Sequence, residues 1–519
     1  MYLPMLNDSL EPMYIQIYQS IRDDCLRGRL LAGDKLPSRR KMASELSVSI
    51  NTVDSAYQQL VSEGYLESRP RSGFRVRKLH IGRELPLPDA LISTSHHSNT
   101  IQNNMPLPVE IDKIKEHTIK TPPKNPAALW IPEKPINATT SDIIDFSPNG
   151  VDTQALPIRD IRRITREVLS ESPDNIFASC PPQGTLQLRF ALCRYLERMR
   201  GLSCHPDRII IGAGTDYLLQ YLLILLRHRS PVRSIAMENP LYNKAFQIFS
   251  GLGEKVRLIP LDENGLNINA LQESDADIVY VTPSHQFPMG TVMPAGRRSE
   301  LLSWCATHPN RFIIEDDYDS EFRYAGRPIP PLSAMENASD VIYLGSFSKA
   351  IAPSLRAGYL VLPEELAQIS REKMAYFNTT LSVPEQLILA RFIETGLFER
   401  HISRMRTLYK KKRDTLLDQL APYKSALDIS GTDAGLHVLC TVHRRHTESQ
   451  LIRYAKTANV KVYGISNYYS KTSDAETSVR SKDHFCADIP DSTVLLGYAT
   501  LSKEDITRGI QRLAEAWTL

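Results

Sequence analysis

The chain has 519 residues, of which 42% are hydrophobic and 23% are charged. This is the composition of a soluble globular protein, and the length predicts two or three domains rather than one. The net charge of +3 identifies no partner for the protein as a whole, and seven cysteines without a C-x-x-C pair argue against a disulfide framework or a zinc ribbon.

The N-terminal segment MYLPMLNDSLEP contains acidic residues and lacks the apolar core of a signal peptide. The most apolar run of the chain, YLLQYLLILL, is too short to span a bilayer. The histidines form no H-E-x-x-H motif, so we expect no metal site. These features predict a cytoplasmic protein that works in a reducing compartment and has no membrane partner.

Residues 1–78 combine helical periodicity with a short hairpin pattern. Apolar residues at helical spacing predict a first helix that stops near Gly28 and a second that Ser38 can cap. The turn SVS leads to a third helix, and YLESRPRSGFRV predicts two strands around a turn that ends in Gly73. Two short helices about a tight turn are the helix-turn-helix layout, whose second helix enters the major groove of DNA.

Positive charge supports a nucleic-acid partner for this region. Arginine and lysine residues open the second helix and crowd the hairpin, where a small domain can neutralise phosphates. The alternative is a three-helix interaction module with a solvated basic face. The charged residues are Arg39, Arg40, Lys41, Arg69, Arg71, Arg75 and Arg77.

The stretch LPSRRKMASELSVSINTVDSAYQQLVSEGYLESRPRSGF resembles the winged helix-turn-helix of GntR regulators, whose pattern is L-P-S-x-R, S-R-x-T-V-x-x-A-Y, E-G and a wing glycine. One departure is Ile50, where the family usually has an arginine that reads a base edge, so the operator sequence cannot be inherited from other members. The resemblance implies double-stranded DNA as partner and DNA-contacting roles for Arg40, Ser49, Asn51, Thr52 and Gly73.

Residues 79–142 are rich in Pro, Ser, Asn and His and show little periodicity. Such a segment cannot bury enough apolar surface to order itself alone, so we expect a linker. From residue 143 to residue 519, short apolar strands alternate with helices, which predicts an α/β domain with a mainly parallel sheet. The predicted strands lie in RIIIGAG, RSIAMEN, DIVYVTPS, RFIIEDD and DVIYLGS.

Lys349 follows one of these strands and a small-residue turn, in YLGSFSKAIAPSLRAGYL. A lone lysine there is most often a solvated loop residue, but Asp316 and Tyr318 end a strand that should lie nearby, and a helix begins at Thr215 after a glycine turn. A helix N-terminus favours a phosphate. A dinucleotide fingerprint is the weaker alternative, because the full G-x-G-x-x-G motif is absent.

An amine, an aspartate, a tyrosine and a phosphate cradle together suit pyridoxal 5′-phosphate. Lys349 would form a Schiff base with the aldehyde, and partial burial would lower its pKa. Asp316 would hold the pyridine nitrogen protonated, and Tyr318 would hydrogen-bond the ring oxygen. Ser346, Ser348 and Arg356 add donors for the phosphate.

The same region resembles fold-type I aminotransferases through GSFSK…P-x-L-R, EDDYDSEF, TPSHQFPMGTVMP and GAGTDYL. Behind a GntR-type domain, it resembles the MocR subfamily (MocR/GabR-type transcriptional regulators), in which a smaller C-terminal α/β subdomain and a head-to-tail homodimer are implied. In this resemblance Tyr242 stacks on the ring and His285 lies beside it. The implied cofactor-binding set is Lys349, Asp316, Tyr318, Tyr242, His285, Gly214, Thr215, Asp216, Ser346, Ser348 and Arg356.

The effector pocket departs from the members that respond to GABA. In those members two arginines clamp the effector carboxylate, and the matching positions here are Lys244 and Asn467. Lysine can replace the charge but not the bidentate fork, and asparagine replaces neither. We therefore expect another amine, or pyridoxal phosphate itself, as the effector.

The sequence predicts a pyridoxal phosphate-dependent DNA-binding transcriptional regulator whose effector acts through the cofactor on Lys349. One alternative is a working aminotransferase with an attached DNA-binding module, for which Asn467 weakens the expected substrate clamp. The other is a DNA-binding protein whose large domain is only a dimer scaffold.

Overall fold

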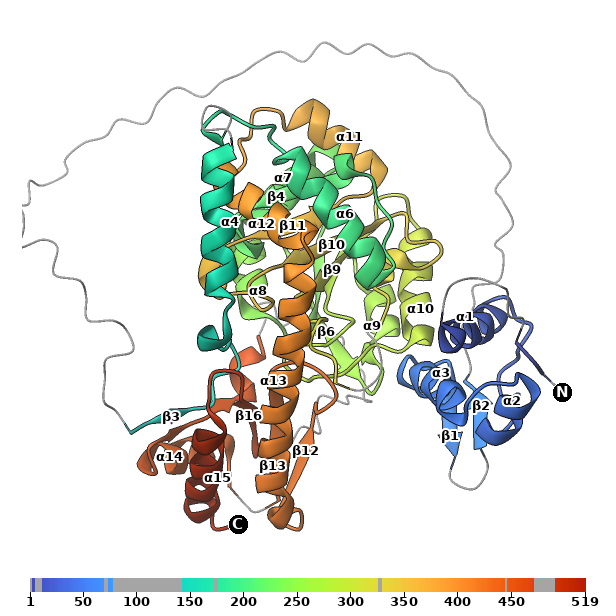
Figure 1. Cartoon of the computed structure of the whole chain (residues 1–519), viewed down its shortest axis with the longest axis vertical. Coiled ribbons are helices and arrows are strands. Elements are labelled where there is room, and N and C mark those ends of the chain that lie inside the picture. Colours follow the sequence, from blue (N-terminus) through green and yellow to red (C-terminus); the bar gives the residue numbers. More distant parts are fainter. Residues whose placement is uncertain are drawn as a thin grey trace, which may run out of the picture. The chain divides into compact units, whose positions relative to one another are not determined.

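The structure is a computed structural model (Figure 1). The predicted linker, residues 79–142, lies outside the described residues except for its last position, so its conformation and boundaries stay predictions. Within the described ranges, no helix has both the length and the apolar composition needed to cross a membrane. The structure describes residues 2–4, 12–69, 73–77, 142–171, 176–324, 329–443, 446–470 and 491–519.

The N-terminal region is a winged helix-turn-helix, as predicted. Ser38 and Ser49 cap α2 and α3, because each side chain accepts a hydrogen bond from a backbone N–H of the first helical turn. The wing strands are antiparallel, with Leu66 opposite Val76. The elements are α1 (Met13–Leu26), α2 (Arg39–Glu45), α3 (Ile50–Ser62), β1 (Leu66–Arg69) and β2 (Gly73–Val76).

A small aromatic core joins the helices of this region to its wing. Tyr57 on α3 is fully buried, and its ring lies 4.8 Å from the ring of Phe74 in an edge-to-face contact. The Tyr57 hydroxyl donates to the carbonyl of Pro37 at 3.0 Å. α3 and the wing therefore share one core, which sets the orientation of the exposed face of α3.

The large domain is built on a sheet that has eight strands among the described residues. All five predicted strands are present, and β9 pairs in parallel with both β8 and β10. β11 is antiparallel to β10, because the short connection between them leaves no room for a crossover. In spatial order the strands are β4 (Ile209–Gly212), β11 (Gly358–Val361), β10 (Val341–Ser346), β9 (Phe312–Asp317), β8 (Ile278–Val281), β5 (Ile235–Asn239), β6 (Val256–Asp262) and β7 (Gly265–Leu266).

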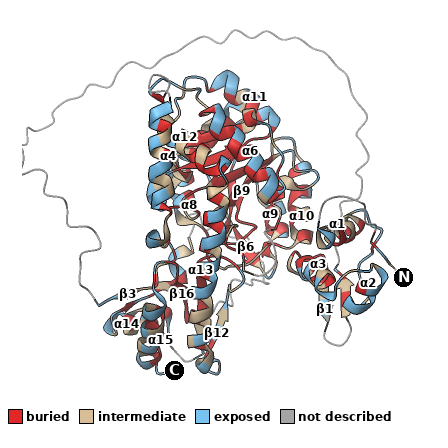
Figure 2. Cartoon of the chain, in the orientation of Figure 1, coloured by how far each residue is buried: buried red, intermediate tan, exposed pale blue. Residues whose placement is uncertain are grey.

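Helices cover both faces of this sheet, as expected when strands are apolar on both sides. Ile342 on β10 packs with α7, α8 and α11, whereas its neighbour Tyr343 packs on the opposite face with α4, α6 and α12. α9 and α10 pack against Val279 and Ile313. Figure 2 shows the strands largely buried and the helices buried on one side. The helices are α4 (Ile158–Glu171), α6 (Leu186–Arg200), α7 (Thr215–Arg229), α8 (Asn243–Gly251), α9 (Ile268–Glu273), α10 (Ala295–Ala306), α11 (Glu364–Lys373) and α12 (Val383–Glu394).

The predicted smaller C-terminal subdomain follows the long helix α13 (Leu397–Leu420). Its antiparallel sheet has the order β12-β13-β16-β15, and its core contains Val438, Val494 and Trp517. The strand β3, at the start of the domain, pairs in parallel with β14. The elements are β3 (Ile144–Asp145), β12 (Leu427–Ser430), β13 (His437–Val442), α14 (Glu448–Thr457), β14 (Val460–Lys461), β15 (Tyr463–Gly464), β16 (Thr493–Gly497) and α15 (Lys503–Trp517).

Candidate functional site

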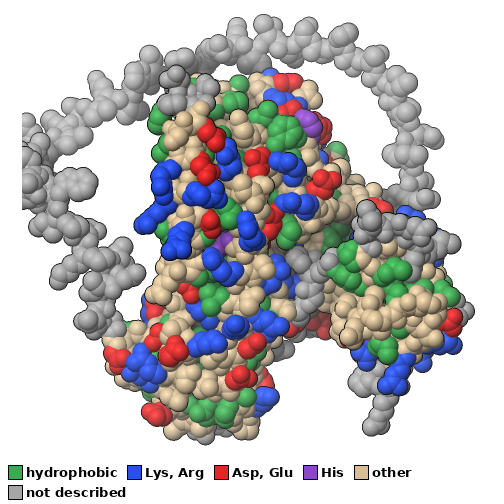
Figure 3. All heavy atoms as spheres, viewed as in Figure 1, with side chains coloured by type: hydrophobic (Ala, Val, Ile, Leu, Met, Phe, Trp, Pro, Cys, Tyr) green, Lys and Arg blue, Asp and Glu red, His purple; other side chains and the backbone are tan. Residues whose placement is uncertain are grey.

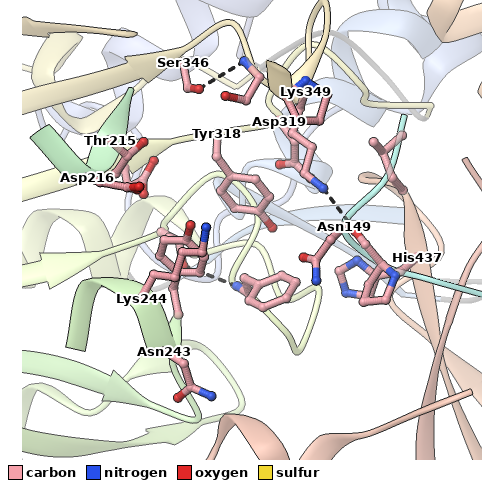
Figure 4. Close-up of a pocket in the computed structure, with 18 of the residues that line it drawn as sticks. Asn149, Thr215, Asp216, Asn243, Lys244, Tyr318, Asp319, Ser346, Lys349 and His437 are labelled. Carbon is pink, nitrogen blue, oxygen red and sulfur yellow. Dashed lines mark hydrogen bonds between the residues drawn. The ribbon is translucent and has the colours of Figure 1, made fainter. Parts of the chain in front are cut away.

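The carboxyl ends of β9 and β10 open into a cavity of about 410 Å³. Asp316 near the end of β9 lies opposite Leu344 of β10 in the parallel register, and Lys349 follows the end of β10 by three residues. This is where open α/β sheets place their ligands. Of the predicted cofactor and effector residues, those that line the cavity are Thr215, Asp216, Tyr242, Lys244, Asp316, Tyr318, Ser346, Ser348, Lys349 and Arg356 (Figure 4).

The Lys349 amine points into this cavity, where its Nζ donates a hydrogen bond to the carbonyl oxygen of Pro148 at 3.1 Å. The loss of solvation lowers the pKa of Lys349 to about 8, and the nearby Asp319 carboxylate opposes that change. A lowered pKa increases the fraction of neutral amine near neutral pH. The neutral amine is the form that attacks a carbonyl carbon.

Asp316 has one carboxylate oxygen without a partner among the described residues. Its Oδ2 accepts a hydrogen bond from the Tyr280 hydroxyl, while Oδ1 is enclosed and accepts none from the described residues. Burial raises the pKa of Asp316 to about 7. The neighbouring Asp317 points to the other face of the sheet and pairs with Arg200 at 2.6 Å. A buried acceptor of this kind fits a protonated ring nitrogen as its missing donor.

The end of the cavity next to the start of α7 carries donors suited to a phosphate. Gly214 precedes α7 at φ +82°, and a Cβ there would lie 2.8 Å from Nη2 of Arg356. α7 begins at Thr215 without a side-chain cap, so its first backbone N–H groups are available. Asp216 pairs with Arg356 at 2.8 Å, which makes its carboxylate a positioning group for the guanidinium rather than a phosphate ligand.

The predicted residues Tyr318 and His285 lie at different distances from the cavity. Tyr318 lines the cavity, and its hydroxyl donates to the main-chain oxygen of His285 at 3.0 Å. His285 is only 2% exposed and does not line the cavity. Its Nδ1 lies 2.8 Å from a carboxylate oxygen of Asp319, so His285 fixes the position of Tyr318 and Asp319 from behind.

The two predicted effector residues have different surroundings. Lys244 is exposed and lines the cavity. Asn467 is not among the lining residues: its side chain donates to the Gly464 carbonyl at 3.4 Å, and its main-chain oxygen accepts from the Asn243 side chain. Asn467 therefore shapes the wall through Asn243 instead of facing a ligand.

Sequence reasoning missed several lining residues, namely Asn149, Asn243, Asp319, His437 and Tyr468. Asp319 belongs to the motif EDDYDSEF and could have been selected from it. Asn243 and Tyr468 are direct neighbours of the predicted residues Tyr242, Lys244 and Asn467, whereas no motif marks Asn149 and His437. His437 belongs to β13 of the C-terminal subdomain, and Asn149 follows β3, which pairs with β14 of that subdomain.

The predicted DNA-binding residues lie at the start of α2, the start of α3 and the wing. Arg40 and Asn51 are exposed, whereas Ser49 caps α3 through the backbone N–H of Thr52 at 3.0 Å. Gly73 adopts φ +88°, which favours glycine at this turn. Figure 3 shows Lys and Arg side chains on this region near the wing. The side chain of Ile50 is 49% exposed at the first position of α3.

Two protein families match the chain. Bacterial regulatory proteins of the gntR family match residues 13–76, and aminotransferases of class I and II match residues 141–482. The HTH-type transcriptional regulator YdeL of Bacillus subtilis is 36% identical over 518 residues, which are 99% of each chain. The probable rhizopine catabolism regulatory protein MocR of Rhizobium meliloti is 29% identical over 98% of this chain and 94% of its own.

Among solved structures, the kynurenine aminotransferase of Pyrococcus horikoshii in complex with PMP is similar to the large domain. It is 26% identical, covers 73% of this chain and 91% of its own, and has a TM-score of 0.60. The aminotransferase class I and II fold implies pyridoxal 5′-phosphate as cofactor. The amine of Lys349, and the Asp316 oxygen that has no partner among the described residues, fit that group.

Proposed function

Because the chain belongs to the MocR-type regulators, which join a GntR-family DNA-binding domain to an aminotransferase class I and II domain, we propose that it binds pyridoxal phosphate on Lys349 and senses an amine through it. One observation carries the proposal: a desolvated lysine and an aspartate line the same cavity, and one enclosed oxygen of that aspartate has no partner among the described residues. In this proposal the amine serves imine formation, and the aspartate serves the protonated ring nitrogen of the cofactor.

Each end of the cavity has its own task in this proposal. Asp316 holds a proton on the ring nitrogen, and Tyr242 covers the ring face. The first turn of α7, with Arg356, holds the phosphate. When bound, pyridoxal phosphate supplies an aldehyde carbon that one amine can leave and another can occupy.

With the cofactor held on Lys349, an amine effector would compete with the lysine amine for the same aldehyde carbon, so the lysine side chain would be free when the effector is bound. The contacts of the freed amine and of the effector differ between the two states, and such a difference is what an effector needs to shift a conformational equilibrium. The shift changes the arrangement of the DNA-binding domains and so controls transcription. Pyridoxal phosphate itself is the second candidate effector, because its binding alone changes the charge around Asp316.

The colour of the purified protein tests this proposal. We expect an absorbance band near roughly 410–430 nm that borohydride bleaches and that Lys349→Ala lacks. An inert scaffold would show no band even after incubation with pyridoxal phosphate. A band that persists in Lys349→Ala would contradict the assignment of the lysine.

A working aminotransferase remains the alternative function, and the cavity does not favour it. Among the described lining residues the only arginine is Arg356, which is committed to the phosphate end, so no second guanidinium fork is present for a substrate carboxylate. Sustained conversion of an amino acid and a keto acid at about one turnover per second or faster would favour the enzyme.

The same feature excludes GABA as effector in our proposal. Each charge-assisted hydrogen bond that an arginine would supply contributes roughly 1.5–3 kcal/mol, so affinity should fall by about tenfold or more for each such bond that is missing. Calorimetric titration of the cofactor-loaded protein with GABA tests this, and micromolar binding would overturn it.

The regulator acts in the cytoplasm as a head-to-tail homodimer on double-stranded DNA in this proposal. The support is its membership in the MocR-type regulators and the length of the predicted linker, residues 79–142. Sedimentation velocity of the full chain measures the oligomeric state. A monomer at micromolar concentration, with and without cofactor, would contradict the dimer.

A further inference from the structure

The effector end of the cavity is lined mainly by neutral groups and by hydrogen-bond acceptors. Once the residues assigned to the cofactor are set aside, Lys244 is the remaining cation among the described lining residues, and it is exposed. Asp319 adds a carboxylate that is already engaged by His285 at 2.8 Å. The remaining polar lining residues are Asn149, Asn243, Thr282, His437 and Tyr468.

His437 is the first residue of β13 and is 3% exposed. It is one of the residues that line the cavity (Figure 4). Its Nε2 lies 2.9 Å from the main-chain oxygen of Pro288. A carbonyl oxygen can only accept, so Nε2 must carry the proton. The approach of this strand to His285 requires Gly435, at which a Cβ would overlap with His285 Cε1.

The His437 ring is neutral under physiological conditions. Burial lowers the pKa of His437 to about 3, and the neighbouring His285 and Lys349 act in the same direction. A neutral ring with its proton on Nε2 has a bare lone pair on Nδ1. No described residue donates to Nδ1, and Nδ1 is not among the enclosed polar atoms that lack a partner. The atom therefore keeps some accessible surface on a ring that lines the cavity, where it can act as an acceptor.

We propose that His437 Nδ1 selects the effector by accepting a hydrogen bond from its second functional group. The effector class is then an amine that carries a hydroxyl or another neutral donor, in place of a carboxylate. An acceptor repels the lone pairs of a carboxylate, and the wall offers no fork to compensate. This inference depends on the proposed function, because it assumes that the amine reaches the cofactor on Lys349.

The test compares amino alcohols with amino acids of equal chain length on the cofactor-loaded protein. The pairs are ethanolamine with glycine, aminopropanol with β-alanine, and aminobutanol with GABA. Affinity is measured by calorimetry, and engagement of the cofactor is measured by the change in its absorbance band. We expect the amino alcohol of the best-fitting length to bind at least about tenfold more tightly than its amino acid.

Two variants separate this role from a purely structural one. In His437→Asn the amide oxygen can take the position of Nδ1, so we expect the preference for the alcohol to persist. In His437→Gln the longer amide can keep the hydrogen bond to Pro288, but Nδ1 is lost, so we expect the preference to disappear. Retention of the cofactor band and of the melting temperature shows that each variant is folded.

The outcomes are distinct. Equal binding of alcohol and acid, or an unchanged preference in His437→Gln, overturns the role of His437 while amine sensing stands. If no amine of either series alters the cofactor band, the proposed amine sensing fails, and the inference fails with it. A preference that survives in His437→Asn and is lost in His437→Gln supports the inference.

Discussion

Replacing Asp316 with asparagine should have opposite effects with and without the cofactor. In the wild type the carboxyl is buried, Oδ2 accepts from Tyr280, and Oδ1 has no described partner. Asparagine keeps an oxygen for Tyr280 but cannot ionise. The cofactor-free variant should therefore be more stable than the wild type at high pH, although it should bind the cofactor more weakly.

The magnitude for the cofactor-free protein comes from the raised pKa of Asp316. The pKa of about 7 lies above the ordinary value of 3.8, so the native state binds this proton more tightly than the unfolded chain does. That preference corresponds to about 4 kcal/mol of stability at most, present below pH 3.8 and lost as the pH rises through 7. Asparagine does not ionise and so avoids this loss. Its amide N–H needs a partner in the buried site, which offsets part of the benefit. Above pH 7 we therefore expect the free energy of unfolding to rise by about 1–3 kcal/mol.

With the cofactor bound, the sign reverses. In the proposed complex, the ionised Asp316 would make a charge-assisted hydrogen bond to the protonated ring nitrogen, which would contribute about 1.5–3 kcal/mol. Its loss should weaken cofactor binding by roughly tenfold to a hundredfold.

Thermal unfolding with and without pyridoxal phosphate, at one pH well below 7 and one well above it, measures both effects. Asp418→Asn, which alters an exposed acid on α13, is the matched control and should change neither value. The reasoning is refuted if Asp316→Asn shows the same pH dependence as the wild type without cofactor, or binds the cofactor as tightly.

Three further substitutions test other parts of the account. Arg40→Ala should weaken binding to the protein's own upstream region and reduce the salt dependence, by about 0.9 in the slope of log K against log salt for each phosphate that is no longer neutralised; an unchanged gel shift at matched salt would count against the groove assignment. Ile50→Arg should create a preference for guanine at one operator position when binding sites are selected from random duplexes. Arginine recognises guanine, whereas an apolar side chain contacts the thymine methyl group. Identical selected sequences for both proteins would show that position 50 does not face a base. Gly214→Ala places a methyl 2.8 Å from Arg356 at φ +82°, so equilibrium titration should show weaker cofactor binding, and unaltered affinity would contradict the phosphate cradle.

The strands, and the part of the site at the carboxyl ends of β9 and β10, could be predicted from local sequence patterns. Apolar runs marked the five strands correctly, and strand alternation explains why Asp316 faces the cavity while Asp317 pairs with Arg200. Two other features of the fold left no such pattern in the sequence. They are the antiparallel pairing of β11 with β10 and the pairing of β3 with β14, which joins segments far apart in the chain.

The part of the site near Asn149, His437 and Asn467 could not be predicted in the same way. Asn467 was selected by its position relative to a motif, but the orientation of its side chain toward Gly464 depends on the local turn. His437 and Asn149 reach the cavity from β13 and from the segment after β3, which are almost three hundred residues apart. The tautomer of His437 depends on the Pro288 carbonyl, and the sequence gives no sign of that contact.

The most direct test of the account is to reduce the purified protein with borohydride in the presence of pyridoxal phosphate and to locate the adduct by peptide mass spectrometry. We expect one modified side chain, Lys349, whose amine lies in the cavity with Asp316. A protein without adduct, or a modification confined to other lysines, would contradict the central claim.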